Sequence, residues 1–360
     1  LGWSLSFIFA GFSVSILLGG LLAKPSARFI ERWGGRVTMT LGSLVAATGL
    51  ALLGLTNDPF VYMLAWLVLG LSTRMTLYDS AFATLVELYG LGARRAISIL
   101  TLFGGLASTI FWPVCHLVNE SIGWRGTWFV CAALVLVICT PLHAFLPAKG
   151  ETALPQTADG EVAADPAPLV GPDQKSFAVA MLALALAMNS FVFTALSAHF
   201  IPALILMGLS AAAATWIASI KGVFQTIGRF FELVFGANLH PLTLAILSMA
   251  FTPLGFLAFA LTGASEAGAI IFSICYGVSN GLVTIVRGGV PLALFGRKGY
   301  ASVLASISAP GLIVTASAPV GFALMLDTIG VVPGFAVLFA LSVASLIATL
   351  VLAWRFHRRS

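Results

Sequence analysis

The chain has 360 residues, of which 59% are hydrophobic and only 9% are charged, and its mean hydropathy is +1.05. Soluble domains average ~25% charged residues, so this composition excludes a soluble globular protein. It indicates a helical protein that crosses the lipid bilayer many times. The net charge of +5 does not indicate a nucleic-acid partner, because basic residues in the short loops of a membrane protein set its orientation.

Apolar stretches long enough to cross a bilayer follow one another along the chain. The eleven predicted spans are 3–23, 37–55, 60–86, 95–117, 124–146, 176–205, 210–235, 241–262, 267–291, 300–326 and 331–354. The connections are short except for 147–175, which is rich in Pro, Ala and acidic residues and is typical of a flexible linker. We therefore expect an N-terminal helix bundle (1–146), a linker and a C-terminal helix bundle (176–360).

Lys and Arg residues predict the orientation of these spans. With the linker placed in the cytoplasm, thirteen of them lie inside and only Arg125 lies in an outside loop. This asymmetry predicts a cytoplasmic linker and C-terminus for a multi-pass protein of a bacterial inner membrane. It also places Leu1 outside, as expected if a first span is missing from the chain.

An internal repeat supports the missing span. Residues 70–100 and 277–304 both run from Gly-x-Ser through a span to an aromatic-Gly pair and a basic pair. The third predicted span therefore corresponds to the ninth, and the fourth to the tenth. An offset of six spans predicts two parallel six-helix halves whose first helix is absent, a plan found among transporters.

The loop at 27–36, ARFIERWGGR, resembles the loop signature G-x-x-x-D-R-x-G-R-R of the major facilitator superfamily. Ala27, Glu31 and Gly35 depart from that signature. The resemblance implies the major facilitator fold, with helices II to XII present, and secondary active transport without a cofactor.

Other segments resemble the monocarboxylate-porter and oxalate/formate-antiporter-like branches of this superfamily. They are the opening LGWS of residues 1–4, the run ARRAI at 93–97 and PLALFG at 291–296. Arg229 matches a branch in which a cation of helix VIII meets an organic anion.

The span 210–235 carries a polar stripe. On a helix, its Lys221, Gln225, Arg229 and Glu232 fall within about 80° of one another. Lys221 lies close to the bilayer midplane, where a charged side chain normally faces protein or a watery cavity and marks function. We expect it to line the cavity, the alternative being a structural lysine paired to a neighbouring helix.

Further polar residues within the spans extend this site. Arg74 shares a helical face with Tyr78, whereas Asp79 lies ~140° from Arg74 around a continuous helix, so no direct pairing is expected. Arg287 lies near the inner end of its span and either lines the cavity or reaches the interface. The predicted substrate-binding residues are Arg74, Tyr78, Lys221, Gln225, Arg229, Asn280 and Arg287.

The acidic residues predict coupling and gating. Asp79 and Glu232 are candidates for carrying a proton, the alternatives being ion pairs, with Arg229 three residues before Glu232 as its nearest partner. A salt bridge from Glu87 to Arg32 or Arg36 would hold an inner gate. The predicted gating residues are Glu31, Arg32, Arg36 and Glu87.

The sequence lacks enzyme signatures. It contains neither a phosphate-binding glycine loop nor a zinc-ligand spacing. The four cysteines (Cys115, Cys131, Cys139 and Cys275) lie in apolar spans and are typical of small core residues. We expect neither a cofactor nor a metal. We also expect a monomer, because each bundle buries its own faces.

These features predict a secondary active transporter of a small organic anion such as a carboxylate, with coupling to protons as a further hypothesis. The cations within the spans outnumber the nearby acids, and a cavity lined by one sign of charge selects the opposite sign. One alternative is an exporter of uncharged or cationic molecules, with all the cations paired structurally. The other is a truncated remnant or membrane sensor that does not transport.

Overall fold

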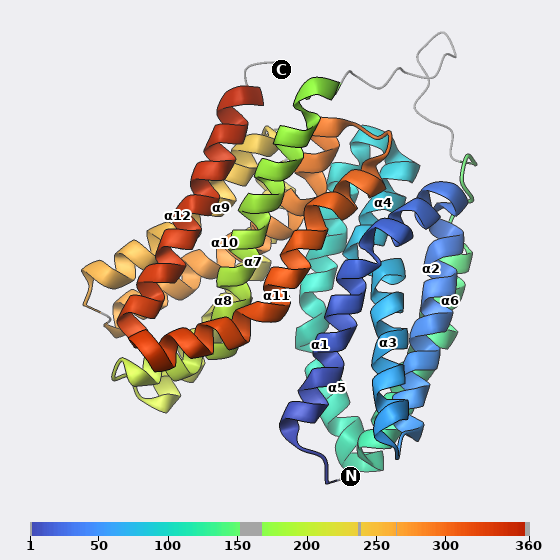
Figure 1. Cartoon of the computed structure of the whole chain (residues 1–360), viewed down its shortest axis with the longest axis horizontal. Coiled ribbons are helices and arrows are strands. Elements are labelled where there is room, and N and C mark those ends of the chain that lie inside the picture. Colours follow the sequence, from blue (N-terminus) through green and yellow to red (C-terminus); the bar gives the residue numbers. More distant parts are fainter. Residues whose placement is uncertain (1, 152–167, 237–238, 264, 357–360) are drawn as a thin grey trace. The chain divides into compact units, whose positions relative to one another are not determined.

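The structure is a computed structural model that describes residues 2–151, 168–236, 239–263 and 265–356. Helices account for nearly all of these residues, and this part of the chain contains no strand (Figure 1). All eleven predicted spans are helical, which confirms the expected all-helical membrane fold.

The helices follow one another with short connections. Three short elements, η1 (Gly90–Gly92), the π-helical η2 (Val135–Cys139) and η3 (Pro172–Gln174), interrupt or precede the α-helices. The α-helices are α1 (Leu5–Leu21), α2 (Ala23–Leu55), α3 (Pro59–Thr76), α4 (Tyr78–Tyr89), α5 (Ala93–Leu134), α6 (Thr140–Ala144), α7 (Lys175–Leu206), α8 (Ala211–Phe235), α9 (Pro241–Leu261), α10 (Glu266–Phe295), α11 (Tyr300–Ile329) and α12 (Val331–Phe356).

Two of these helices contain a sharp turn at glycine. Gly34 in α2 and Gly123 in α5 have φ values of 78° and 73°, in the left-handed region that side chains other than glycine rarely adopt. Each glycine therefore divides its helix into two rods. The rod after Gly34 matches the predicted span 37–55, and the turn at Gly123 separates the predicted spans 95–117 and 124–146.

The predicted span 60–86 is broken in the structure. Leu77, with ψ of −167°, separates α3 from α4. Just before the break, the hydroxyl groups of Ser72, Thr73 and Thr76 donate to carbonyl oxygens of the preceding turn. Such hydroxyl-to-backbone bonds compete with the helix ladder and bend helices.

Eight helical segments of the described chain are long and apolar enough to cross a membrane. They are Ala23–Leu55, Pro59–Tyr89, Pro113–Ala144, Pro172–Leu206, Pro241–Leu261, Glu266–Phe295, Tyr300–Ile329 and Val331–Phe356. The shorter Phe7–Leu21 is also apolar. Helix α8 is not among the eight, since its polar stripe lowers the hydropathy of an otherwise apolar rod.

The chain divides into two compact units. Unit 1 comprises Leu1–Ala93, Ala107–Ala167 and Gly296–Ile313, and unit 2 comprises Arg94–Leu106, Pro168–Phe295 and Val314–Ser360. Helices α5 and α11 therefore each contribute residues to both units.

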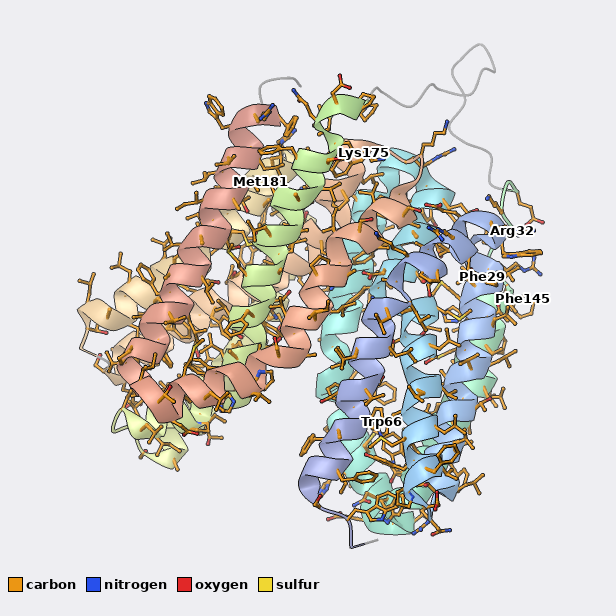
Figure 2. The ribbon with its side chains drawn as sticks, viewed as in Figure 1. Phe29, Arg32, Trp66, Phe145, Lys175 and Met181 are labelled. Carbon is orange, nitrogen blue, oxygen red and sulfur yellow. The ribbon has the colours of Figure 1, made fainter. Side chains whose placement is uncertain are left out.

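In unit 1, α3 packs against both α1 and α2 (Figure 1). An aromatic contact joins α1 to α3, because the ring centroid of Trp66 lies 5.8 Å from that of Phe12 (Trp66, Figure 2). Within α3, Trp66 also lies 6.2 Å from Tyr62 between ring centroids. The Tyr62 hydroxyl donates to the Ile8 carbonyl oxygen at 2.7 Å. Edge-to-face aromatic contacts of this kind stabilise packing beyond the area they bury.

In unit 2, α10 packs against α8 and α9, and α12 packs against α7 and α9. The core is rich in phenylalanine, and ring contacts connect each of Phe256 and Phe259 to both Phe272 and Phe335. Most of the predicted linker, 152–167, lies outside the described residues. Its last part is attached to this unit, because Val170 is buried and its N–H donates to the Leu294 carbonyl oxygen.

Candidate functional site

Lys221 of α8 places its ammonium group among side chains of α7 and α10. Its Nζ lies 3.4 Å from Ser197 Oγ, and 5.2 Å and 5.4 Å from the ring centroids of Phe193 and Tyr276. The ring faces stabilise the cation electrostatically without removing its charge. Among the described residues, no Asp or Glu lies within ion-pair distance of Lys221.

Two glycines fix the backbone that carries this lysine. A Cβ atom at Gly277 of α10 would lie 2.5 Å from the Lys221 carbonyl oxygen, and one at Gly281 would lie 2.3 Å from that of Gln225. Both distances are shorter than van der Waals contact, so only glycine allows α10 to approach α8 this closely. Asn280 is half-buried between the two glycines.

Arg229, predicted to line the cavity, is only 3% exposed. Its Nε donates to the Gly281 carbonyl oxygen at 3.4 Å and its Nη2 to Thr284 Oγ1 at 3.0 Å. Its Nη1 lies where a Cβ at Gly105 of α5 would stand, 2.0 Å away. The guanidinium group therefore packs α8 against α10 and α5 in this structure, and its role in substrate binding stays a prediction.

The sequence suggested Arg229 as the partner of Glu232. In the structure Glu232 pairs instead with residues of α5. Its Oε1 lies 3.2 Å from Arg94 Nη2, and Ser98 Oγ donates to its Oε2 at 2.6 Å. Arg94 also donates to the carbonyl oxygens of Gly236 and Leu239, just after α8 ends. This buried cluster fastens the first turns of α5 to the end of α8.

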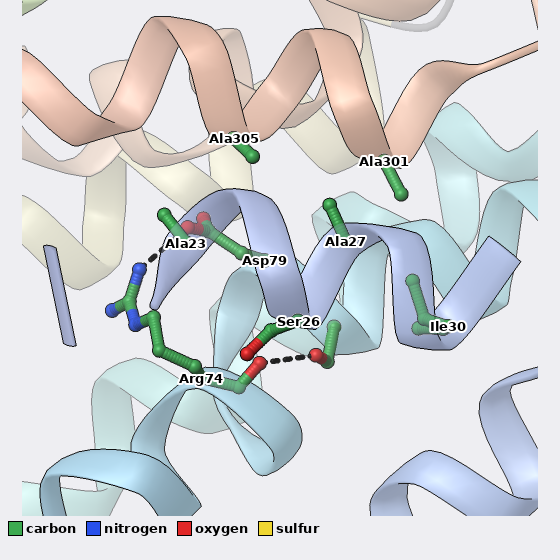
Figure 3. Close-up of a pocket in the computed structure, with 9 residues that line it drawn as sticks. Ala23, Ser26, Ala27, Ile30, Arg74, Asp79, Ala301 and Ala305 are labelled. Atoms are coloured by element: carbon green, nitrogen blue, oxygen red, sulfur yellow. Dashed lines mark hydrogen bonds and ion pairs between the residues drawn. The ribbon is translucent and has the colours of Figure 1, made fainter. Parts of the chain in front are cut away.

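Arg74 and Asp79 form an ion pair with Nη1 2.8 Å from Oδ2, contrary to the prediction that they do not pair (Figure 3). The prediction assumed a continuous helix, whereas the break at Leu77 turns Asp79 back toward Arg74. The same break removes the helical spacing expected between Arg74 and Tyr78, and Tyr78 instead stacks on Phe82. Arg74 lies in the last turn of α3 and Asp79 in the first turn of α4, the ends at which each charge is stabilised by the helix dipole.

A small cavity of about 20 Å³, large enough for one water molecule, adjoins this ion pair (Figure 3). The Ser80 hydroxyl closes one side by donating to the Arg74 carbonyl oxygen at 2.5 Å. The lining residues are Ala23, Ser26, Ala27, Ile30, Arg74, Asp79, Ser80, Ala301 and Ala305. This space is too small for an organic substrate.

The predicted gating residues make other contacts than expected. Glu87 Oε2 accepts from the Gly35 N–H at 3.1 Å, so it caps the rod that follows Gly34. The described residues show no ion pair between Glu87 and Arg32 or Arg36, because both arginines point outward and are exposed (Arg32, Figure 2).

Glu31 instead accepts from the Ser302 N–H at 2.9 Å, in the first turn of α11. A carboxylate at a helix N-terminus is stabilised by the helix dipole. Arg287, predicted in the cavity or at the interface, is half-buried and interacts with other protein groups.

Four residues of these contacts were not predicted as site residues from the sequence: Arg94, Ser98, Ser197 and Phe193. A signal for the first two exists. The tetrapeptides RFIE at 28–31 and RFFE at 229–232 share one pattern, and the glutamate of each holds the first turns of a long helix. Ser197 and Phe193 are ordinary residues of an apolar helix and give no signal of their own.

The described residues contain no group of three or more side chains that could hold a metal ion. The cysteines are free and half-buried.

A family model described as Major Facilitator Superfamily matches residues 1–309. Comparison with curated proteins finds no significant match.

Among solved structures, the chain resembles an E. coli fucose:proton symporter with a TM-score of 0.70 and 12% identity, covering 99% of this chain and 90% of that one. It resembles a proton:xylose symporter with a TM-score of 0.71 and 14% identity, covering 97% and 85%. It also resembles a human organic anion transporter with a TM-score of 0.66 and 16% identity, covering 96% and 82%. At these identities the structural likeness shows the fold, and the family model carries the assignment: the chain belongs to the Major Facilitator Superfamily and is a membrane transporter, not an enzyme.

Proposed function

We propose that this protein is a secondary active transporter of a small organic anion, such as a carboxylate, working by alternating access of two helix bundles (1–146 and 176–360). The observation that carries the proposal is the ammonium group of Lys221. It lies in the middle of a span, beside Ser197 and two aromatic rings, without a carboxylate partner in the described part of the chain.

A charge in that position needs compensation. Placing a lysine at the centre of a membrane helix costs on the order of 2.5–3.5 kcal/mol on insertion scales. At exposed sites a cation–π contact offsets roughly 0.5–1 kcal/mol, so the two contacts of Lys221 leave part of the cost uncompensated. A carboxylate that reaches Nζ would supply the missing counter-charge, with Ser197 as a second donor and Gln225 one turn further along α8.

Replacing Lys221 with glutamine tests this proposal. In proteoliposomes, we expect Lys221→Gln to abolish uptake of labelled organic anions, whereas Lys221→Arg keeps part of it. The exposed Lys175→Gln serves as the matched control, because it removes the same charge at the start of α7. Normal uptake by Lys221→Gln would mean that the lysine is structural, and the anion proposal would fall.

We further propose that transport is linked to protons through Asp79 or Glu232. In this structure each carboxylate is paired with an arginine, so the neighbouring charges do not favour one of the two as the proton carrier. Coupling would require one pair to open between the two states, since loss of the cation favours protonation. Accumulation driven by an imposed pH gradient supports coupling, and accumulation driven only by an anion on the opposite side supports exchange.

An alternative substrate class is uncharged. Arg74, Arg229 and Arg287 all interact with protein groups, which favours a structural role for these cations. Two of the similar structures are named as symporters of the sugars fucose and xylose, and a third as an organic anion transporter. Uptake of labelled sugars alongside the anions decides between the two classes. The branch resemblance to monocarboxylate porters agrees with the anion.

A further inference from the structure

The first rod of α2, from Ala23 to Trp33, separates its buried residues from its basic ones. The rod connects the predicted spans 3–23 and 37–55, so it lies at the end of unit 1 where the bilayer meets water. The buried residues follow the spacing of one helix face: Ala23, Ser26, Ala27 and Ile30. The exposed cations recur at every fourth position and form a basic stripe about 80° wide, made of Lys24, Arg28 and Arg32.

Aromatic side chains border this basic stripe. The rings of Phe29 and Trp33 lie 6.4 Å apart between centroids, and Arg32 Cζ lies 5.3 Å from the centroid of the Trp33 ring. Trp33 is 51% exposed, and Phe145, just after α6, is 84% exposed. Figure 2 shows Phe29, Arg32 and Phe145 on the same side of unit 1. Exposed aromatic rings beside a row of cations are typical of a helix that lies in the membrane interface.

The basic stripe has no ion-pair partner within the described part of unit 1. Glu31, the acidic residue of the rod itself, accepts from the Ser302 N–H. The other acidic residues of this part bind backbone N–H groups or other basic side chains: Asp58, Asp79, Glu87, Glu120 and Glu151. Like charges four residues apart destabilise a helix. The stripe therefore favours an anion that unit 1 does not supply.

We propose that the basic stripe binds the phosphate groups of anionic phospholipids, such as phosphatidylglycerol, in the leaflet at this end of unit 1. The cations bind the phosphates, and Phe29 and Trp33 pack against the upper part of the acyl chains. A soluble phosphate would leave these rings in water, whereas a lipid covers them. Lipid binding here does not depend on which substrate the protein transports. Lys24 precedes the loop signature, and Arg28, Phe29 and Trp33 stand at its undefined positions.

Quenching of Trp33 by brominated lipids measures this binding. The full-length protein and its Trp33→Phe variant are reconstituted in phosphatidylcholine vesicles with a small share of brominated phosphatidylglycerol or of brominated phosphatidylcholine. The difference between the two proteins isolates the signal of Trp33 from that of the other tryptophans. Each basic residue near an anionic lipid surface raises affinity about 5-fold. We therefore expect phosphatidylglycerol to be preferred at Trp33 by at least about 5-fold.

Double variants assign this preference to the stripe. Lys24→Gln/Arg28→Gln should remove most of the preference, whereas Lys24→Arg/Arg28→Lys, which keeps both charges, should retain it. Lys175→Gln/Lys298→Gln is the matched control, because it removes two exposed cations outside the rod. This control should keep the preference of the unmodified protein.

Several results would overturn lipid binding at the stripe. They are equal quenching of Trp33 by the two lipids, quenching by neither, a preference that survives Lys24→Gln/Arg28→Gln, and an equal loss in the matched control. Glycerophosphoglycerol, the headgroup without its acyl chains, is added at the concentration of the lipid. An unchanged preference supports a lipid, whereas its loss would show that a soluble phosphate is enough and would overturn the assignment.

Discussion

The ion pair between Arg94 and Glu232 is expected to be one of the strongest single interactions in unit 2. The Glu232 side chain is 3% exposed and that of Arg94 is 18% exposed. Removing one partner of a buried ion pair costs about 3–5 kcal/mol, since it leaves the other charge uncompensated. Arg94 keeps the carbonyl oxygens of Gly236 and Leu239 as acceptors. We therefore place Glu232→Gln at or below the lower end, at about 2–3 kcal/mol.

A double-mutant cycle measures this interaction directly. The free energy of unfolding in detergent, followed by tryptophan fluorescence during denaturant titration, is compared for Glu232→Gln, Arg94→Gln and the double variant. We expect the loss of stability in the double variant to be smaller than the sum of the two single losses by about 1.5–2 kcal/mol, because residues in contact couple. Arg95→Gln, an exposed neighbour, should change stability by less than about 0.5 kcal/mol. Additive single effects would refute the assignment of Glu232 to Arg94.

Three further outcomes are expected. Gly105→Ala should destabilise the protein, because its Cβ would meet Arg229 Nη1, whereas Gly222→Ala, with open space around it, should be neutral or stabilising by up to about 1 kcal/mol; equal melting temperatures would contradict the packing. Asp79→Asn should destabilise the protein, and Arg74→Gln on the same background should add little, so a large additional loss would show that Arg74 has another main partner. In intact cells, single cysteines placed in the 147–175 linker should resist an impermeant thiol reagent, and ready labelling would show that the linker lies outside rather than in the cytoplasm.

Much of the fold was predictable because the physical signal is strong. Burying backbone groups in lipid requires helices, so the apolar stretches located helical segments at all eleven predicted spans. Helix α8 is among them, although its polar stripe keeps it out of the eight described segments that are long and apolar enough to cross a membrane. The break at Leu77 was not predicted, since Ser72, Thr73 and Thr76 are common in continuous helices as well. That single local departure changed the expected relation of Arg74 to Asp79.

The candidate site was predictable only in part, for a different reason. Helical periodicity places Lys221, Gln225, Arg229 and Glu232 on one stripe, but it does not say which neighbouring helix each one meets. The partner of Glu232 is 138 residues away in the chain, and a contact at that separation leaves no periodic trace. Local spacing therefore suggested Arg229, whereas packing selected Arg94.

The division of α5 and α11 between the two units bears on where these helices can bend. The division falls after Leu106 in α5 and after Ile313 in α11. In each helix the division lies within a few residues of a pair that disfavours a straight helix, Gly104-Gly105 in α5 and Pro310-Gly311 in α11. Glycine makes a helix easier to bend, and proline removes one of its backbone hydrogen bonds. Both helices therefore carry, close to the division between the units, residues at which a helix bends most easily.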